Sequence, residues 1–92
     1  MWTHVEGMEG RKLKLYALST CGWCKKTKDL LGENGVAYDY VFVDLLSSAD
    51  KDSAIAEMEK MVSDLAFPLL VIDEELSIQG YKPEDIQVAI HG

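Results

Sequence analysis

The two cysteines of this chain are separated by two residues and lie where a strand pattern gives way to a helix pattern. Before them, over about residues 12–18, apolar residues alternate with others, which is typical of a strand. After them, over about residues 22–33, apolar residues recur at helical spacing. This succession constrains the fold most, because it places Cys21 and Cys24 at the first turn of a helix.

The start of a helix is a reactive position for a thiol. Unpaired backbone N–H groups and the positive end of the helix dipole favour the thiolate, which is the attacking form of cysteine. Cys24 lies one turn beyond Cys21 and can close a small disulfide with it. Lys25 and Lys26 are expected to support the thiolate modestly, because their long side chains are solvated. The motif therefore predicts a redox-active disulfide that opens and closes.

Other interpretations of the cysteine pair compete with redox cycling. A structural disulfide is disfavoured because so short a loop removes little entropy from the unfolded chain. Half of a zinc site is disfavoured because the other soft ligands, His4 and His91, lie near opposite ends of the chain. Inert buried thiols are disfavoured because Gly22 and Trp23 have the character of an exposed loop. We therefore expect a dithiol site with no metal and no further bound cofactor.

Length and charge restrict the class of protein. The 92 residues are expected to form one domain, 1–92, in which residues 1–10 are a loose lead-in. A net charge of −7 argues against nucleic acid and anionic membrane surfaces as partners, and no segment is apolar over the width of a bilayer. Residues 1–10 also lack the apolar core of a secretion signal. We therefore expect a cytoplasmic protein, and a monomeric one.

The rest of the chain predicts an α/β fold. Beyond the first strand and helix, a strand is expected over 37–45, a helix over 50–64, a hairpin from strands at 69–72 and 76–78, and a last helix from Pro83. The order is β-α-β-α-β-β-α. The first two strands are joined through a helix and should be parallel, whereas the hairpin strands are antiparallel. One mixed four-stranded sheet flanked by three helices follows.

Three segments of the chain stand out as landmarks: Cys21-Gly22-Trp23-Cys24, Phe67-Pro68, and Ile78-Gln79-Gly80-Tyr81-Lys82-Pro83-Glu84-Asp85. Together they resemble the landmarks of the glutaredoxin family, within the thioredoxin superfamily. The resemblance spans about residues 12–90 and implies the thioredoxin/glutaredoxin fold. The third landmark is similar to that of glutaredoxin-like redoxins, which donate electrons to ribonucleotide reductase and are recharged by thioredoxin reductase.

The resemblance implies a role for individual residues. Cys21 would be the nucleophile, and Cys24 would resolve the mixed disulfide. Pro68 would follow a cis peptide bond and lie against the cysteines, with the backbone of Phe67 pairing with a substrate like an added strand. The other residues expected at the partner-binding surface are Gly22, Trp23, Gly80 and Tyr81.

We therefore expect a dithiol thiol–disulfide oxidoreductase that transfers electrons to protein disulfides. Its expected targets are ribonucleotide reductase or similar proteins, and its expected electron source is thioredoxin reductase or a similar reductase. A glutathione-dependent glutaredoxin is an alternative, although Pro83, Glu84 and Asp85 stand where many members hold glutathione with small polar groups. A dimer sharing an iron–sulfur cluster through Cys21 and glutathione is another, because Gly22 follows the cysteine as in some cluster-binding members. A scaffold with a vestigial site is disfavoured by the intact cysteines.

Overall fold

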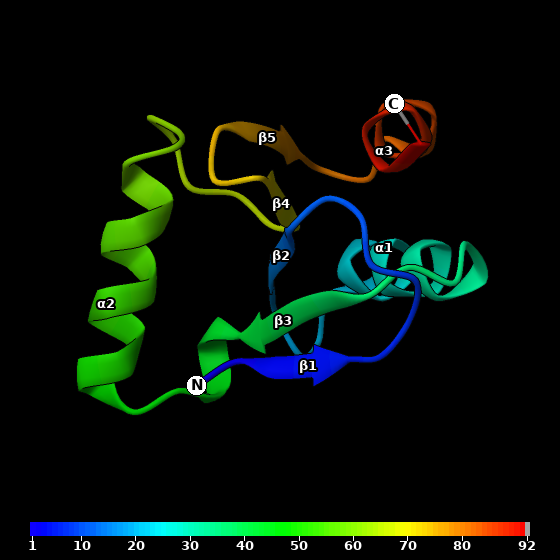
Figure 1. The fold of residues 1–92 in the computed structure, drawn as a ribbon. Helices are drawn as coiled ribbons and strands as arrows, with labels where there is room; N and C mark the ends of the chain where they lie inside the picture. Colours follow the sequence, from blue (N-terminus) through cyan, green and yellow to red (C-terminus); the bar gives the residue numbers. More distant parts are fainter. Residues whose placement is uncertain (92) are drawn as a thin grey trace.

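The computed structural model describes residues 1–91 (Figure 1). The chain forms, in order, β1 (Thr3–Val5), β2 (Leu13–Ala17), α1 (Gly22–Glu33), β3 (Tyr38–Phe42), the 3-10 turn η1 (Val43–Leu45), α2 (Ser48–Glu59), β4 (Leu69–Ile72), β5 (Leu76–Gln79) and α3 (Pro83–His91). The predicted order of strands and helices is therefore present, with one short strand before it. None of the helices within residues 1–91 is long and apolar enough to cross a membrane.

All five strands form one mixed sheet in the order β1-β3-β2-β4-β5. β2 and β3 are parallel, as predicted from the helix between them, and the other neighbouring pairs are antiparallel. Leu15 in the middle of β2 lies opposite Tyr40 of β3 and Leu70 of β4. The cysteines follow the end of β2, so the central strand of the sheet places them.

Helices cover both faces of this sheet, with α2 on one face and α1 and α3 on the other (Figure 1). Alternate side chains of β2 are buried in the cores on the two faces of the sheet, because successive side chains of a strand point to opposite faces. Leu13, Leu15 and Ala17 are buried in one core with Leu31 of α1. Tyr16 is buried in the other core, which contains residues of α2. The α/β fold expected from the sequence is thus confirmed.

The first ten residues are not a loose lead-in, in contrast to the prediction. Thr3–Val5 pairs antiparallel with Tyr38–Tyr40 and forms one edge of the sheet. The chain then passes close to the segment before β3 at Gly7, where a Cβ would lie 2.5 Å from the Val36 carbonyl carbon. The sheet therefore has five strands instead of the expected four, because β1 is created by a pairing with residues far along the chain.

Two elements end earlier in the structure than their apolar sequence patterns predict. The strand expected over 37–45 gives way to η1 at its last three residues. The helix expected over 50–64 is observed as Ser48–Glu59. Met61 and Val62 still pack against the core under α2 after the helix has ended. The apolar periodicity thus continues into a segment that is packed but not helical.

Candidate active site

Cys21 is the N-cap residue of α1. Its backbone is extended, with φ −94° and ψ 117°, and its Sγ accepts a hydrogen bond from the Cys24 backbone N–H, with an N–Sγ distance of 3.2 Å. The Cys21 side chain is partly exposed, so its sulfur can be reached by a partner.

Cys24 is buried one turn further along, and both cysteines are free thiols in this structure. Its Sγ lies 3.5 Å from the backbone N–H of Leu18, which donates to it. Burial, more than the neighbouring Cys21 sulfur, raises the pKa of Cys24 above its ordinary value. The two thiols therefore differ in environment: one is partly exposed with a backbone donor aimed at it, and the other is buried and has a raised pKa.

Asp44 of η1 fixes the loop that precedes the cysteines. Its carboxylate accepts two hydrogen bonds from Ser19, one from the backbone N–H at 2.8 Å and one from the hydroxyl. These bonds lower the pKa of Asp44 below its ordinary value. Sequence reasoning treated Asp44 as part of a strand and missed this contact. The available signal was a carboxylate near the end of a largely apolar run that also contains Asp39.

Trp23 and Tyr81 form an aromatic pair beside the dithiol. Their ring centroids are 5.8 Å apart with an interplanar angle of 23°, and Trp23 is 58% exposed. Lys26 Nζ lies 4.9 Å from the centroid of the Trp23 ring. The pair joins the first turn of α1 to the segment before α3, which are far apart in the sequence.

The Phe67–Pro68 segment lies at the start of β4, and its peptide bond is cis, as the resemblance implied. Pro68 is buried, and its carbonyl oxygen accepts a hydrogen bond from the Gly80 backbone N–H at 2.8 Å. Gly80 has a φ of +89°, which a residue with a side chain rarely adopts. Phe67 is partly buried and packs against both cores. The hydrogen bond from Gly80 to Pro68 thus holds the start of β4 and the end of β5 together.

The predicted site residues are thus largely brought together at one end of the sheet. Cys21, Phe67 and Tyr81 all pack, partly buried, against the core under α1 and α3. Lys25 is exposed on α1, and its backbone N–H donates to the Cys21 carbonyl oxygen at 3.1 Å. A Cβ at Gly22 would meet nothing within 4 Å, so nothing in the chain itself requires a glycine there.

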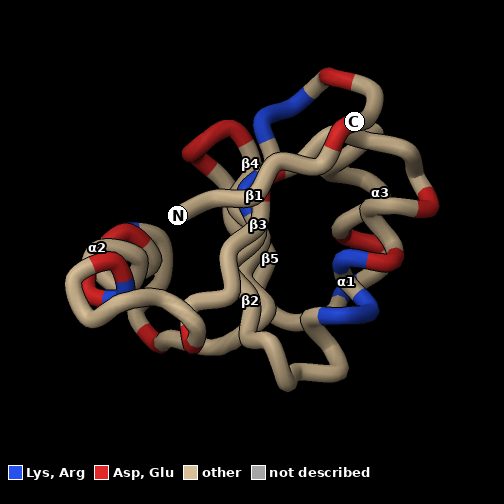
Figure 2. Tube along the Cα trace, turned by 90° about the horizontal axis from the view of Figure 1, so that it is seen from below, with Lys and Arg blue, Asp and Glu red and all other residues tan. Residues whose placement is uncertain are grey.

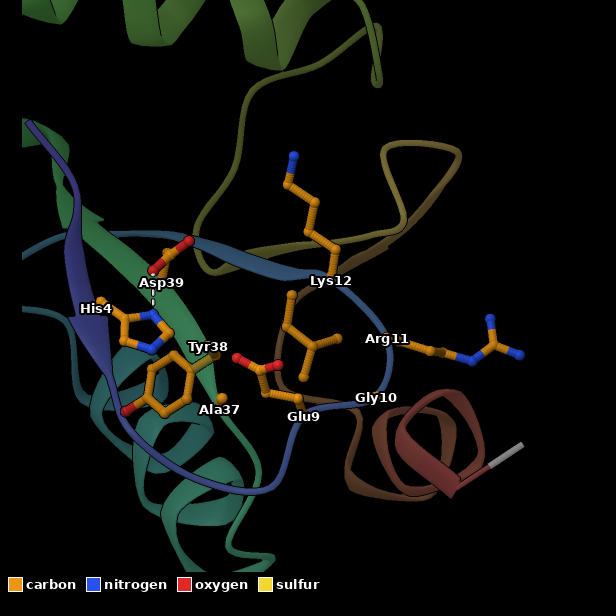
Figure 3. A pocket seen from close by; sticks show the side chains of 9 residues that line it. His4, Glu9, Gly10, Arg11, Lys12, Ala37, Tyr38 and Asp39 are labelled. Atoms are coloured by element: carbon orange, nitrogen blue, oxygen red, sulfur yellow. Dashed lines mark hydrogen bonds and ion pairs between the residues drawn. The ribbon is translucent and has the colours of Figure 1, made fainter.

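A cavity of about 240 Å³ lies at the other end of the sheet and contains none of these residues (Figure 3). It is lined by residues around the beginnings of β2 and β3, including Leu13 and Tyr38. His4 also lines it, and its ring Nδ1 is 2.7 Å from an Asp39 carboxylate oxygen. Its basic side chains are already paired, His4 with Asp39, and Arg11 and Lys12 with Asp73 and Glu74 outside the lining, so the concavity does not identify a second reactive centre.

The amino-acid sequence matches the sequence profile of the glutaredoxin family over residues 13–77. It is also 32% identical over 78 residues to a glutaredoxin-like 8.6 kDa protein from a rubredoxin operon of Clostridium pasteurianum. That alignment covers 85% of this chain and 96% of the relative.

Two solved structures share the arrangement of strands and helices. The glutaredoxin of Methanosarcina mazei Go1 superposes with a TM-score of 0.92 at 38% identity, covering 99% of this chain and 88% of that chain. The methanoredoxin of Methanosarcina acetivorans superposes with a TM-score of 0.85 at 38% identity, covering 91% of this chain and 97% of that chain. These likenesses confirm the fold that the three sequence landmarks implied.

Proposed function

This chain belongs to the glutaredoxin family, and we propose that it is a thiol–disulfide oxidoreductase that reduces protein disulfides through Cys21 and Cys24. The observation that carries the proposal is the contrast between the two thiols. Cys21 is a partly exposed helix cap that receives a backbone N–H, whereas Cys24 is buried with a raised pKa. A nucleophile must be ionised and accessible, and a resolving thiol should stay protonated until the first step is complete.

The proposed reaction proceeds in two exchanges. The Cys21 thiolate attacks one sulfur of the target disulfide, so that the target S–S bond breaks, a target thiolate leaves and a mixed disulfide with Cys21 forms. Cys24 then loses its proton and attacks Cys21 Sγ, which releases the second target thiolate. The products are a reduced target and a Cys21–Cys24 disulfide, so two electrons have passed to the target.

We assign the docking of the target to an aromatic rim, which consists of Trp23, Phe67 and Tyr81. Trp23 is largely exposed and stacked on Tyr81, an arrangement that offers a rigid apolar surface beside the sulfur. Gly22 and Gly80 complete the surface without side chains that would obstruct a partner, and Pro68 is buried next to Phe67. The backbone of Phe67 would pair with an extended segment of the target.

The electron source that we propose is a thioredoxin reductase or similar flavoprotein. The proposed target is ribonucleotide reductase or a comparable cytoplasmic protein, and the proposed working form is the monomer. The support comes from the start of α3. Pro83 has no backbone N–H there, and Glu84 and Asp85 occupy the first turn. A pocket of about 280 Å³ at this point is lined by these residues and Lys82. The carboxylate of glutathione would meet two carboxylates in it, which disfavours binding.

The test compares two reducing systems on one disulfide-containing protein at matched concentrations. One contains NADPH and thioredoxin reductase, and the other contains NADPH, glutathione and glutathione reductase. We expect turnover with the first system and little with the second. Saturable turnover with glutathione alone would assign the chain to the glutathione-dependent members. Visible absorbance after anaerobic purification would instead support the shared iron–sulfur cluster.

A further inference from the structure

The two sides of α1 next to Cys21 differ in chemistry. One side faces α3 and presents the Trp23–Tyr81 stack. The other faces β3, where a pocket of about 200 Å³ lies directly against the reactive cysteine. The residues that line this pocket are Leu18, Ser19, Cys21, Lys25, Lys28 and Phe42. We refer to it as the lysine pocket.

Aromatic rings hold one lysine of the pocket in place. Lys28 Nζ lies 3.8 Å from the centroid of the Tyr40 ring and 4.9 Å from that of Phe42. Such contacts restrict a flexible side chain while leaving its ammonium hydrogens free to bind an anion. Lys25 lies three residues before Lys28, on the same part of the helix surface. The pocket therefore presents two positive charges beside Cys21, at least one of them held in position.

Within the described part of the chain, these lysines lack the ion pairs that other basic residues make. Lys25, Lys26 and Lys28 form no ion pair among residues 1–91, whereas Arg11, Lys12 and Lys14 each contact a carboxylate. The chain carries 16 acidic and 9 basic residues, and three of those basic residues lie within 25–28. Figure 2 shows this group as blue segments on α1. A group of three lysines beside the thiol thus interrupts an acidic protein, and the carboxylate of Asp44, which is hydrogen-bonded to Ser19 of the pocket, offsets part of their charge.

From this arrangement we infer that the lysine pocket is a subsite for a carboxylate side chain adjacent to the target cysteine. The inference rests on the proposed function and names its substrate class: protein disulfides with an acidic residue next to the attacked cysteine. A segment of target crossing Cys21 would place an apolar residue against the aromatic rim and an acidic residue in the lysine pocket. A protein segment fits better than a small thiol, because it spans both sides of α1 at once.

The test uses disulfide-containing peptides that are identical except for the residue beside one cysteine, which is Glu, Gln or Lys. The pre-reduced full chain is mixed with each peptide in a single turnover, and loss of the peptide disulfide is followed by chromatography. We expect the Glu peptide to react about three- to tenfold faster than the Gln peptide at low ionic strength. The Lys peptide should be the slowest. At about 1 M salt the preference should disappear, because the Debye length falls to about 3 Å.

Two variants localise the effect. Lys28→Gln should bring the ratio of the Glu to the Gln rate close to one. Lys26→Gln removes the same charge from the other side of the same helix and should leave the ratio nearly unchanged. The ratio is the relevant readout because any change in the reactivity of Cys21 affects both peptides equally. Circular dichroism checks that both variants are folded.

Equal rates for the Glu and Gln peptides in the unmodified protein would overturn the inference while leaving the proposed function intact. An equal fall of the Glu-to-Gln rate ratio in Lys28→Gln and Lys26→Gln would also overturn the inference. It would indicate that the lysines act by their overall charge and not through a subsite. If reduction by glutathione depended on Lys28 while the peptides reacted equally, the pocket would belong to a small anionic thiol. Failure to reduce any peptide would instead overturn the proposed function itself.

Discussion

The two ends of the sheet use charged residues in different ways. At the end where β2 and β3 begin, charged side chains pair with one another: Arg11 with Asp73 at 3.4 Å, Lys12 with Glu74 at 3.1 Å, Lys14 with Glu74 at 3.5 Å, and His4 with Asp39 at 2.7 Å. At the cysteine end, the lysines of α1 lie over aromatic rings or beside the thiol. Paired charges at a surface contribute modestly to stability, whereas unpaired charges remain available to a partner. This difference fits the proposal that the cysteine end carries the chemistry while the other end stabilises the fold.

Cys21→Ser should have the largest effect, and only at the cysteine end. A serine hydroxyl cannot form a disulfide, so single-turnover reduction of a peptide disulfide should fall by at least about a thousandfold. Thermal unfolding monitored by circular dichroism should change little, because the side chain is a partly exposed cap. Residual reduction at a substantial fraction of the original rate would show that Cys24 can act alone.

Gly7→Ala should produce the opposite result: lower stability with chemistry retained. The new methyl group would lie 2.5 Å from a backbone carbon of Val36, and we expect a loss of about 1–3 kcal/mol in the free energy of unfolding. Gly10→Ala is the matched control, because a Cβ there meets nothing within 4 Å and should cost less than about 0.5 kcal/mol. Chemical denaturation measures both. A large loss of reduction rate in folded Gly7→Ala protein would contradict the separation of the two ends.

Asp44→Asn tests how the loop before Cys21 is held. It weakens the two hydrogen bonds from Ser19, so the reduction rate should fall about three- to tenfold as the cysteine loses its fixed position. Because the pKa of Asp44 is lowered in the folded chain, its contribution is present above its ordinary pKa and is lost as pH falls through the lowered value. Asp52→Asn, an exposed position on α2, makes the same change in charge and should leave the rate unaltered.

His4→Gln should have the smallest effect, confined to β1. The hydrogen bond with Asp39 raises the pKa of His4 in the folded chain. Its stabilising contribution should therefore be complete below about pH 6.5 and should vanish as pH rises through the raised value. Denaturation midpoints measured below about pH 6.5 and above the raised pKa of His4 should differ in the original chain but not in the His4→Gln variant. Asp39→Asn should remove the same contribution, and the double variant should be no worse than either single variant.

The sequence was most informative where local signals and chemistry coincided. The helix expected over 22–33 is observed as Gly22–Glu33, because Cys21 supplies a cap and the apolar face is regular. The hairpin at 69–72 and 76–78 was also foreseen, since turn residues separate two short apolar runs. At the site, the landmarks predicted the dithiol and placed Trp23 and Tyr81 on one surface, but they did not predict that the two rings stack. The roles assigned to these residues remain predictions for the experiments above.

The features that sequence reasoning missed depend on contacts between distant segments. β1 has three residues, two of them exposed, so its pattern carries no strand signal without its partner β3. The strand expected over 37–45 turns into η1 where Asp44 reaches Ser19 across the sheet end. The lysine pocket has a similar origin, because Lys28 and Tyr40 are brought together only by the packing of α1 on β3. Local periodicity cannot reveal such contacts.

The central claim is that Cys21 alone makes the first attack and Cys24 completes the exchange. It is tested most directly by treating the Cys24→Ser protein with a peptide disulfide, which should trap the mixed-disulfide intermediate. The position of the mixed disulfide is then mapped by mass spectrometry after digestion. We predict one mixed disulfide per chain, located on Cys21, that persists until an external thiol is added. A Cys21→Ser protein that accumulates an equally abundant mixed disulfide on Cys24 under the same conditions would contradict this claim.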